Sequence, residues 1–551
     1  TPWTVYSYTA STDTYTPIGG GRINAPQLTQ SLRTIKTSLV NVRIKYDTDL
    51  GDSRIGAFIA GEQSRTDTSF FQAFRQGYLS PALDELFAGG LTNQQTTGYS
   101  AVNTRNNLFG RLSYGYMSKY LLDLNFRYDG SSNFPAGNRY GFFPGASAAW
   151  RLSQENFISV NLGFVNELKL RASYGKIGND AILPFQDLVL YNLGNTGYNF
   201  GWPSASSQGL VAGVSPNPNI TWEVLTTTNI GLDGALWNDL FGFSIDVFQQ
   251  KRSNILTTRD LAVPLYTGLR LPAENIGVVQ NRGVELSLTS QKTIGQFFYR
   301  VGVNIAYAKS KVLDLSEAQN VPEYQKAKGR VVGAQKYYKA IGIFRTQDEV
   351  NKAAVFPGTI VGNLQYEDVN GDGKISAEDM VMMDKSSIPQ LSYGTNINLE
   401  YKNFSLYVNF AGHAGAWQQY ILNVRNAING FAEVVDNRYK PGSMDSKYPI
   451  LPTIENTNTG EVDGQKSDFW LMNTSFFRLK TLQLGYTVPT SLVSKAKLNS
   501  LRFFVSGSNL FTISKLAKMF DPEIVNINGE TSRGDAYPQT RIFNFGVNLT
   551  F

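Results

Sequence analysis

Apolar and polar residues alternate with a period of two over long stretches of this chain. In the segment IFNFGVNLTF at residues 542–551, Phe, Val and Leu occupy every second position from 543, while Asn, Gly and Thr fill the positions between them. Successive side chains of a β-strand point to opposite sides of its sheet. The segment is therefore predicted to be a strand with one apolar face and one polar face.

The same alternation occurs in YLLDLNFRYD (120–129), YRVGVNIAY (299–307) and LSYGTNINLEY (391–401), and each of them begins or ends in an aromatic residue. Aromatic strand ends with aliphatic residues between them are typical of outer-membrane β-barrels, because amphipathic rings settle at the two headgroup levels. We therefore expect the apolar faces to contact lipid and the polar faces to line a lumen. The residues expected to face lipid include Val303, Leu399 and Val547, and those expected to face the lumen include Asn304, Asn398 and Asn548.

The connections between the predicted strands alternate strictly between short and long. Short ones fall near 50–53, 117–119, 237–240, 294–297 and 402–403, with slightly longer ones near 153–166 and 489–499. Long polar ones fall near 62–105, 176–220, 253–281, 310–389, 412–475 and 512–539, with a shorter one near 130–140. A barrel with tight periplasmic turns and long extracellular loops has this pattern, whereas a soluble β-sandwich has no reason to lengthen every second loop.

The predicted fold is therefore all-β: a transmembrane antiparallel β-barrel with short periplasmic turns and long extracellular loops. The pattern predicts about fifteen strands from residue 39 onward, and the segment TVYSYTA (4–10) is a candidate for one more. Sixteen is an even number of strands that could close alone as a porin, so parity leaves open whether the barrel is complete.

Composition agrees with strands and removes several chemistries. Of the 551 residues, 13% are aromatic, 17% are charged and 51 are glycine, a balance that suits strands and turns. Cysteine is absent, which excludes disulfides, zinc–cysteine clusters and thiol nucleophiles. The single histidine, His413, has no partner for a histidine-based metal site or a Ser-His-Asp triad, and we interpret it as an ordinary polar position.

The charge and the hydropathy pattern limit the partners. The chain has no apolar run of the roughly 18 residues that a transmembrane helix needs. The net charge of +6 is scattered, without a basic stripe, so no nucleic-acid partner is expected. The N-terminal TPWTVYSYTA has neither the basic start nor the apolar core of a signal peptide, so we expect that a leader was removed or that the chain begins late.

The segment DVNGDGKISAED at residues 368–379 has the spacing of a calcium-binding loop. Asp368, Asn370 and Asp372 occupy positions 1, 3 and 5, and a glycine at position 6 supplies the sharp turn. Lys374 offers a backbone carbonyl at position 7, and Asp379 occupies position 12, as in dockerin-type loops. We expect a structural calcium ion that stiffens an extracellular loop; the alternative is a solvated acidic turn.

Eight phrases in the chain resemble one family, the SusC/RagA-like TonB-dependent transporters of Bacteroidetes outer membranes, and they occur in that family's order. They are RYDGSSNF (127–134), NRYGFFPGASAAWRLSQENF (138–157), ITWEVLTTTNIGLD (220–233), NRGVELSL (281–288), VNGDGKI (369–375), PQLSYGTN (389–396), FFRLKTLQLGYTVP (476–489) and SGSNLFT (506–512).

The resemblance implies a barrel of 22 strands, of which residues 1–551 form the C-terminal portion, roughly the last two-thirds, with no recognisable plug or TonB box. It implies TonB-dependent import of oligosaccharides or peptides across the bacterial outer membrane, together with a SusD-like surface lipoprotein. Energy coupling through the TonB complex would then belong to the N-terminal parts of such transporters. The immediate surroundings of the barrel would be outer-membrane lipid.

Other features of the sequence leave room for alternatives. Trp202, Trp417 and Trp470 lie in long connections, where they could stack on sugar rings, although packing of the loops is favoured. Asp and Glu pairs are scattered without a shared pocket, so no enzyme activity is expected. A self-contained 16-stranded diffusion porin and a secreted calcium-binding multi-domain β protein are the alternatives to the transporter.

Overall fold

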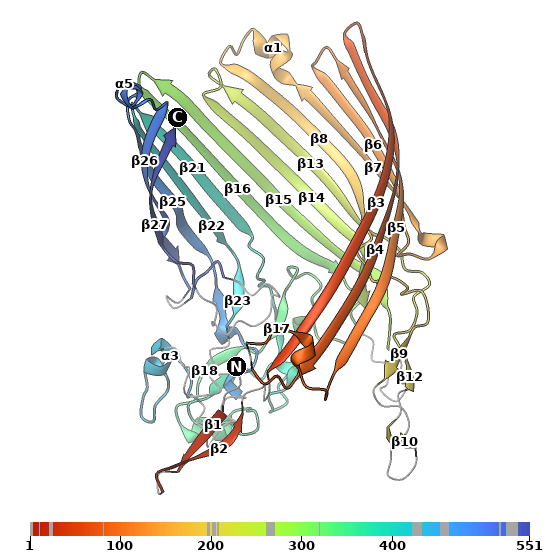
Figure 1. Ribbon diagram of the computed structural model, residues 1–551, viewed down its shortest axis with the longest axis vertical. Helices are drawn as coiled ribbons and strands as arrows, with labels where there is room; N and C mark the ends of the chain where they lie inside the picture. Colours follow the sequence, from red (N-terminus) through yellow and green to blue (C-terminus); the bar gives the residue numbers. More distant parts are fainter. Residues whose placement is uncertain are drawn as a thin grey trace.

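The fold of the chain is one large antiparallel sheet, curved like the wall of a barrel (Figure 1). The computed structural model describes residues 4–9, 12–20, 26–80, 82–194, 199–200, 205–206, 209–259, 270–318, 320–420, 432–451, 462–516, 520–524 and 538–551. Fifteen strands pair in chain order from β3 to β27, which confirms the all-β fold class and the predicted number of strands.

The strands of this sheet are long and follow one another along the chain. The first seven are β3 (Gln27–Leu50), β4 (Ser53–Gln76), β5 (Gln95–Tyr116), β6 (Tyr120–Ser131), β7 (Tyr140–Arg151), β8 (Val165–Asn179) and β13 (Glu223–Leu236). The next four are β14 (Phe241–Thr258), β15 (Ala273–Ile294), β16 (Phe297–Asp314) and β21 (Leu391–Tyr401). The last four are β22 (Phe404–Ala414), β25 (Phe476–Thr487), β26 (Ser500–Ser514) and β27 (Ile542–Thr550).

The register of the sheet shows which residues share its outer face, because directly paired residues lie on the same side. One row of partners runs from β5 to β26 and is apolar or aromatic at every position except a glycine. It consists of Tyr116, Tyr120, Trp150, Leu170, Leu232, Ile245, Leu286, Ile305, Tyr393, Gly412, Phe477 and Ile513. The row begins beside a short turn and ends beside a long loop, so it crosses the membrane obliquely, as tilted strands require.

Aromatic side chains gather at both ends of this outer face. Near the short turns, the rings of Tyr116, Tyr120 and Trp150 stack in series, with centroids 6.5 and 6.3 Å apart. Near the long loops, Tyr393 stacks on Phe477 with centroids 6.3 Å apart. These two belts mark the inner and outer borders of the lipid-facing band, because amphipathic rings favour the headgroup level.

The rows between the apolar ones are polar, as predicted from the alternation. Val303 pairs with Leu288 and Thr395 on the outer face. The next residue, Asn304, pairs with Ser287 and Gly394 on the lumen face. The same division holds for the other residues predicted to face lipid or lumen, Leu399, Val547, Asn398 and Asn548.

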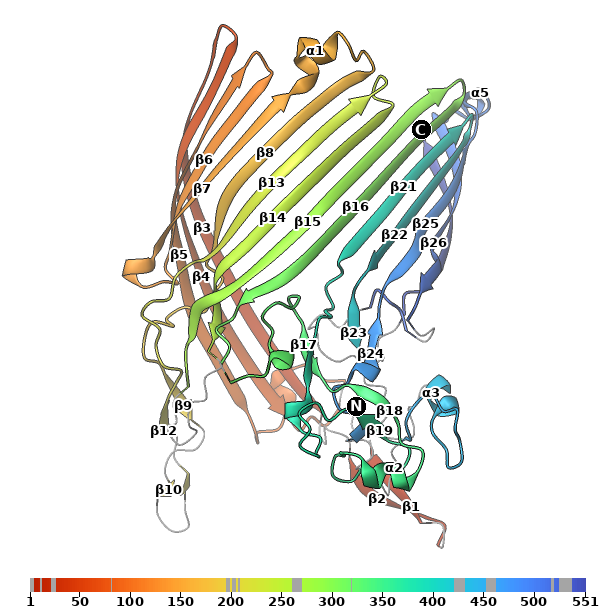
Figure 2. The same cartoon turned by 180° about the vertical axis from the view of Figure 1, so that it is seen from behind.

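Short and long connections lie at opposite ends of the sheet (Figures 1 and 2). The short end carries α1 (Asn156–Ser159), α5 (Thr490–Val493) and the C-terminus. Two of its tightest turns use Gly51 and Gly295 with φ of 59° and 61°, a conformation that glycine adopts without strain. Among the described residues, no helix is long and apolar enough to cross a membrane.

The long connections fold into small elements of their own, most of them two-stranded. These are β9 (Tyr191–Gly194) with β12 (Gly209–Ala212), β10 (Asn199–Phe200) with β11 (Ala205–Ser206), β17 (Gln335–Tyr337) with β20 (Val381–Met383), β18 (Ala340–Ile343) with β19 (Leu364–Tyr366) and β23 (Trp417–Gln419) with β24 (Leu471–Asn473). Helices α2 (Gln347–Lys352) and α3 (Ala432–Asn437) belong to the same end.

Two details of the predicted strand limits are wrong. The first barrel strand begins at Gln27 instead of residue 39, and the loop predicted near 62–105 is a connection between β4 and β5 that spans only 77–94. A tilted strand crosses a bilayer in about 9–11 residues, so strands as long as β3 and β4 continue well outside it. There both faces meet water, and the alternation that marks a strand disappears.

The segment TVYSYTA is also not a strand of the barrel. Its residues Thr4–Thr9 form β1, which pairs only with β2 (Thr14–Gly20) in a separate hairpin at the long-loop end (Figure 1). A strand this short cannot span the bilayer at a tilt. The large sheet therefore has fifteen strands, and its edge strands β3 and β27 both run from the long-loop end to the short-turn end. Two strands with the same direction cannot close an antiparallel barrel against each other, which argues against the 16-stranded porin.

The division into a lipid face and a lumen face predicts an unequal response to charge. Arginine at Val303, midway between Tyr299 and Tyr307 on β16, should cost roughly 2–4 kcal/mol of folding free energy, because its charge would face hydrocarbon near the midplane. Arginine at the neighbouring Asn304 should cost much less, because that side chain faces the polar lumen. Urea unfolding of both variants in lipid vesicles measures the difference. Equal losses of folding free energy would refute the assignment of faces.

Candidate functional site

The lumen face of the sheet and the loops at its outer end form the candidate site. Two sides of the lumen wall differ in charge. On β8, β13 and β14, Arg171 bonds Asp233 through Nε at 3.0 Å and Asp246 through Nη2 at 2.6 Å. Lys169 adds a third contact, with its Nζ 3.0 Å from Asp233 Oδ2. This side of the wall carries charges that are already neutralised by their neighbours.

The opposite side of the lumen wall is built mainly from amides and hydroxyls, with Arg300 and Arg502 as charged exceptions near the short turns. Asn409 Nδ2 donates to Asn396 Oδ1 at 2.7 Å, and the Tyr407 hydroxyl lies 3.1 Å from the same oxygen. The lumen-facing positions around them are Asn304, Asn398, Thr481, Gln483, Ser506, Ser508, Asn544 and Asn548. Such a surface hydrogen-bonds sugars and peptides without preferring a charge.

A recess of about 480 Å³ opens where the lumen wall meets the loop between β16 and β21. Its wall side includes Leu225, Gln250 and Asn281, and its loop side includes Val331 and Ile388. Apolar side chains with a few amide groups are the usual lining of a ligand site. A larger groove of about 720 Å³ is lined mostly by outer-face residues such as Leu122 and Ala148, so it faces lipid and takes no part in this site.

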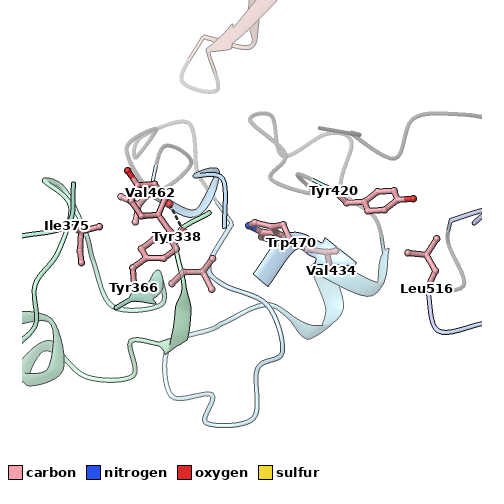
Figure 3. Close-up of a cluster of buried hydrophobic side chains, with 9 residues drawn as sticks. Tyr338, Tyr366, Ile375, Tyr420, Val434, Val462, Trp470 and Leu516 are labelled. Carbon is pink, nitrogen blue, oxygen red and sulfur yellow. Dashed lines mark hydrogen bonds between the residues drawn. The ribbon is translucent and has the colours of Figure 1, made fainter. Parts of the chain in front are cut away.

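Three long connections pack together at the outer mouth into one hydrophobic cluster, which we call the loop core (Figure 3). Tyr338 and Tyr366 come from the connection between β16 and β21, and Trp470 comes from the connection between β22 and β25. The loop core also contains Leu364, Ile375, Tyr420, Val434, Val462 and Leu516. Because these side chains are buried, the loops form a folded unit instead of separate flexible segments.

An ion cluster fixes the last long connection to the wall. The guanidinium of Arg478 on β25 is almost fully buried and pairs with Asp521 at 2.8 Å and with Glu523. Lys480 Nζ lies 2.7 Å from Glu523 Oε1, and Arg478 Nε donates to Thr512 Oγ1 at 2.7 Å. Removing one member of a buried ion pair leaves an uncompensated charge, which is strongly destabilising.

Asp463 joins two of the loops inside the loop core. Its carboxylate accepts hydrogen bonds from the Leu364 amide at 2.7 Å and from Asn363 Nδ2 at 2.8 Å. Its carbonyl accepts the Trp470 indole N–H at 2.7 Å. Burial raises the pKa of Asp463 to about 7, although the two hydrogen bonds to the carboxylate oppose that rise.

The predicted calcium loop forms one tight turn. Asp368 accepts the amides of Gly371 at 2.7 Å and Gly373 at 2.8 Å, and Asp372 accepts the Lys374 amide at 2.8 Å. Asn370 accepts the Asp372 amide at 3.0 Å. The order of these contacts places the side chains at positions 1, 3 and 5 on the same turn.

Asp379, at position 12 of that loop, is fully buried and bound to the turn by amides. Its Oδ1 accepts from Val369 at 2.9 Å, and its Oδ2 accepts from Ser376 at 2.8 Å, where it closes the capping box of a 3-10 turn. In the part of the chain that the structure describes, no three acidic or histidine side chains converge closely enough to hold a metal. Calcium binding at Asp368, Asn370, Asp372, Lys374 and Asp379 therefore stays a prediction.

The other residues considered from the sequence mostly have packing roles. Trp470 is 2% exposed and belongs to the loop core. Trp417 is half-buried under the ammonium of Lys385, with Nζ 3.9 Å from the ring centroid. Trp202 lies outside the described residues. His413, on the lumen face of β22, packs edge-on against Phe476 with ring centroids 4.6 Å apart.

Sequence analysis did not find the Arg478 ion cluster or the role of Asp463. The acidic partners of Arg478 follow it by more than 40 residues, and Asp463 follows Leu364 by 99. No local motif joins these positions. The available signal was the presence of two basic residues, Arg478 and Lys480, in the strand segment FFRLK.

Comparison with known proteins assigns a family. A family model described as TonB dependent receptor-like, beta-barrel matches residues 1–510. TonB-dependent receptor P26 of Formosa agariphila is 31% identical over 551 residues, which cover 95% of this chain and 54% of the relative. TonB-dependent receptor SusC of Bacteroides thetaiotaomicron is 26% identical over 93% of this chain and 50% of the relative. The chain thus spans about half the length of the curated relatives it matches.

A solved structure gives the same architecture. The solved structure of the RagAB peptide transporter superposes with a TM-score of 0.76 at 22% identity, covering 95% of this chain and 56% of that chain. At this identity the likeness concerns the fold. It agrees with the SusC/RagA resemblance of the sequence phrases.

The raised pKa of Asp463 predicts that the loop core loses stability as pH rises. In the unfolded loop the carboxyl titrates near its ordinary value of about 4, so between pH 4 and 7 the folded state holds a proton that the unfolded state has lost. Stability should therefore fall across that interval, by a few kcal/mol at most, and level off above it. Limited proteolysis of the loops at pH 5 and pH 8 measures the change.

The matched variants for this test are Asp463→Asn and Asp348→Asn. Asparagine at 463 cannot ionise, so the difference between pH 5 and pH 8 should disappear. Asp348 is an exposed carboxyl on α2, paired with Lys352, and its replacement should leave the difference intact. A pH response that survives in Asp463→Asn would contradict the role of this residue.

Proposed function

This chain belongs to the family of TonB-dependent receptor-like β-barrels of the bacterial outer membrane, and from that premise we propose that it forms the wall of an active importer. Its cargo is an oligosaccharide or a peptide too large for a porin. The observation that carries the proposal is the outer mouth, where three long loops form one packed unit above a polar wall. A diffusion porin has no need of such a unit.

The lumen wall supports a hydrophilic cargo. Its amide side around Asn396 and Asn409 offers donors and acceptors in equal measure, and its charged side is internally neutralised around Arg171. The recess at the outer end adds apolar surface beside Gln250 and Asn281, where part of the cargo could dock. A wide polar wall selects weakly by itself, so affinity would come from the loops and from a partner above them.

We assign the partner to the class of SusD-like surface lipoproteins. The loop core presents a preformed surface, and a preformed surface lowers the entropic cost of binding a lid. Energy would come from the TonB complex, acting on a part of the full-length receptor other than this wall. SusC and the RagAB transporter supply the analogy for this arrangement.

Uptake by the full-length protein should require TonB and a lipoprotein partner. Labelled oligosaccharides and peptides, supplied to cells with and without TonB, test the first requirement, and co-purification from solubilised membranes tests the second. Uptake that continues unchanged without TonB, or a receptor that never co-purifies with a lipoprotein, would overturn the importer in favour of passive diffusion.

The structure also predicts which arginine this partnership needs. Arg478→Gln should release the connection after β26 and reduce co-purified lipoprotein several-fold, because Asp521 and Glu523 lose their main partner. Arg502→Gln is the matched control: it lies on the lumen face of the neighbouring β26 and bonds Ser405 Oγ at 3.1 Å, far along the strand from the loops. Equal retention of lipoprotein by both variants would show that partner binding does not depend on the loop core.

We further propose that the turn at residues 368–379 holds a calcium ion of structural purpose. The oxygens of Asp368, Asn370 and Asp372 and the carbonyl of Lys374 would be its ligands, with Asp379 nearby. Two observations support these residues as ligands: their spacing in the sequence and their position on a single turn. The buried carboxylate of Asp379 already accepts peptide amides, so its contribution to the ion would be partial.

Calcium should protect this loop from proteolysis, and a chelator should remove the protection while the barrel stays folded. Asp372→Asn should weaken the calcium response about tenfold, because it removes one ligand charge. Glu367→Gln is the matched control, since its carboxylate pairs with Lys339 and lies just outside the turn. Identical proteolysis with calcium and with chelator would refute the ion and leave an acidic turn.

A further inference from the structure

Four basic side chains gather on the outer face of the sheet, at the outer ends of three adjacent strands. They are Lys251 on β14, Arg282 on β15, and Lys309 and Lys311 on β16, and all four are exposed. We call them the outer basic patch. None of them takes part in the lumen wall or in the loop core.

The register places the patch on the lipid side of the wall. Val247, Val284 and Tyr307 are paired in series within the apolar outer face. Two residues farther out along the same strands, the partners are Gln249, Arg282 and Lys309. Side chains two positions apart in a strand share a face, so Lys251 and Lys311 follow on the same side.

The tilt of the strands brings three members of the patch, Lys251, Arg282 and Lys309, to similar heights at the outer border of the membrane, and Lys311 lies farther out. Tyr307 belongs to the outer aromatic level, and Lys309 lies two residues beyond it on β16. Rows of partners climb toward the outside from β5 to β26, by roughly 3 Å per strand at a tilt near 45°. Gln249, the direct partner of Arg282 on β14, is therefore lower in the membrane than Arg282. Lys251 lies two residues farther out than Gln249, which offsets this difference in height. Lys251, Arg282 and Lys309 therefore all lie near the outer headgroups.

The charges of the patch are poorly compensated within the protein. Arg282 and Lys309 are direct cross-strand partners, and like charges in that position destabilise a sheet. Lys309 has a distant contact to Asp384, with Nζ and Oδ2 3.7 Å apart. Among the described residues, Lys251, Arg282 and Lys311 form no ion pair. A multivalent anion between these strands would offset the repulsion.

Elsewhere on the outer rim, the residues that the structure describes form no comparable basic group. On β21 to β26 the corresponding positions are aromatic, with Tyr393, Phe410, Phe477 and Phe511 in contact. On β4, Arg65 is paired with Asp67 at 2.8 Å. Single lysines, Lys36 on β3 and Lys176 on β8, also lie on the outer face. The cluster of uncompensated charge nevertheless lies in one sector of the wall, and a specific anionic lipid fits this better than general attraction to a charged surface.

We propose that the outer basic patch binds the phosphate of an outer-leaflet glycolipid, such as the lipid A part of lipopolysaccharide. The phosphate lies among Lys251, Arg282 and Lys309, and the acyl chains run along the apolar rows below them. Guanidinium and ammonium groups bind phosphate through charge-assisted hydrogen bonds. The bound lipid removes the repulsion between Arg282 and Lys309 and fixes the height of β14 to β16 in the membrane.

Native mass spectrometry of the full-length protein, purified in detergent and stripped of lipid, tests the patch. The probes are phosphorylated lipid A, the same lipid with its phosphate removed, and inorganic phosphate. We expect retention of phosphorylated lipid A and about tenfold less of the other two. The triple variant Lys251→Gln, Arg282→Gln, Lys309→Gln should reduce retention of phosphorylated lipid A at least tenfold, since it removes the three charges that bind the phosphate.

Two controls keep the test decisive. Lys292→Gln removes a lysine from the same face of β15 at the periplasmic border, where it pairs with Tyr299, and should not change retention. The swap Arg282→Lys with Lys309→Arg keeps the charges and should keep most of the binding even if the triple variant folds poorly. Equal retention of both lipid forms, equal binding of inorganic phosphate, or undiminished binding by a folded triple variant would overturn the proposal.

Discussion

The structure depends on one constraint: inside a bilayer, every backbone N–H and C=O must find its partner within the protein. The fifteen paired strands satisfy that requirement everywhere except at the two edges, β3 and β27. Once pairing is fixed, the register divides each strand into a lipid side and a lumen side. The apolar row from Tyr116 to Ile513 and the polar row beside it, with Arg171 and Asp246, are consequences of that single division.

The same constraint gives the short-turn end and the long-loop end of the sheet different roles. Short turns near the inner aromatic belt add little surface, whereas the long connections outside the membrane are free to fold with one another. They do so around Trp470 and Tyr366, and the buried pairing of Arg478 with Asp521 ties them back to the wall. Function can therefore reside in a mouth whose shape is set by loop packing, while the strands below it provide a rigid polar wall. Loss of loop packing should alter binding and leave membrane insertion unchanged.

Sequence analysis predicted the elements that the bilayer dictates. The period of two, the aromatic strand ends and the alternating loop lengths all follow from crossing a membrane with tilted strands, so the faces of Val303 and Asn304 and the strand number were recovered. The predictions from the sequence were wrong outside the membrane, where the bilayer no longer dictates the pattern of residues. Gln27 begins a strand whose outer part meets water on both faces, and TVYSYTA forms a local hairpin. Contacts such as that between Asp463 and Leu364 join residues distant in the chain, and no local pattern encodes them.

The central claim is that one row of paired residues crosses the membrane obliquely on the lipid side. Spin labels at Trp150, Leu232, Leu286 and Phe477, placed one at a time in the full-length protein in vesicles, test it through their accessibility to dissolved oxygen and to a water-soluble nickel complex. The account predicts that immersion depth rises from Trp150 to a maximum near Leu232 and Leu286 and falls again at Phe477, while labels at Arg171 and Asp246 of the next row stay accessible to nickel. A uniform depth along the row, or nickel access at Leu232 equal to that at Asp246, would contradict it.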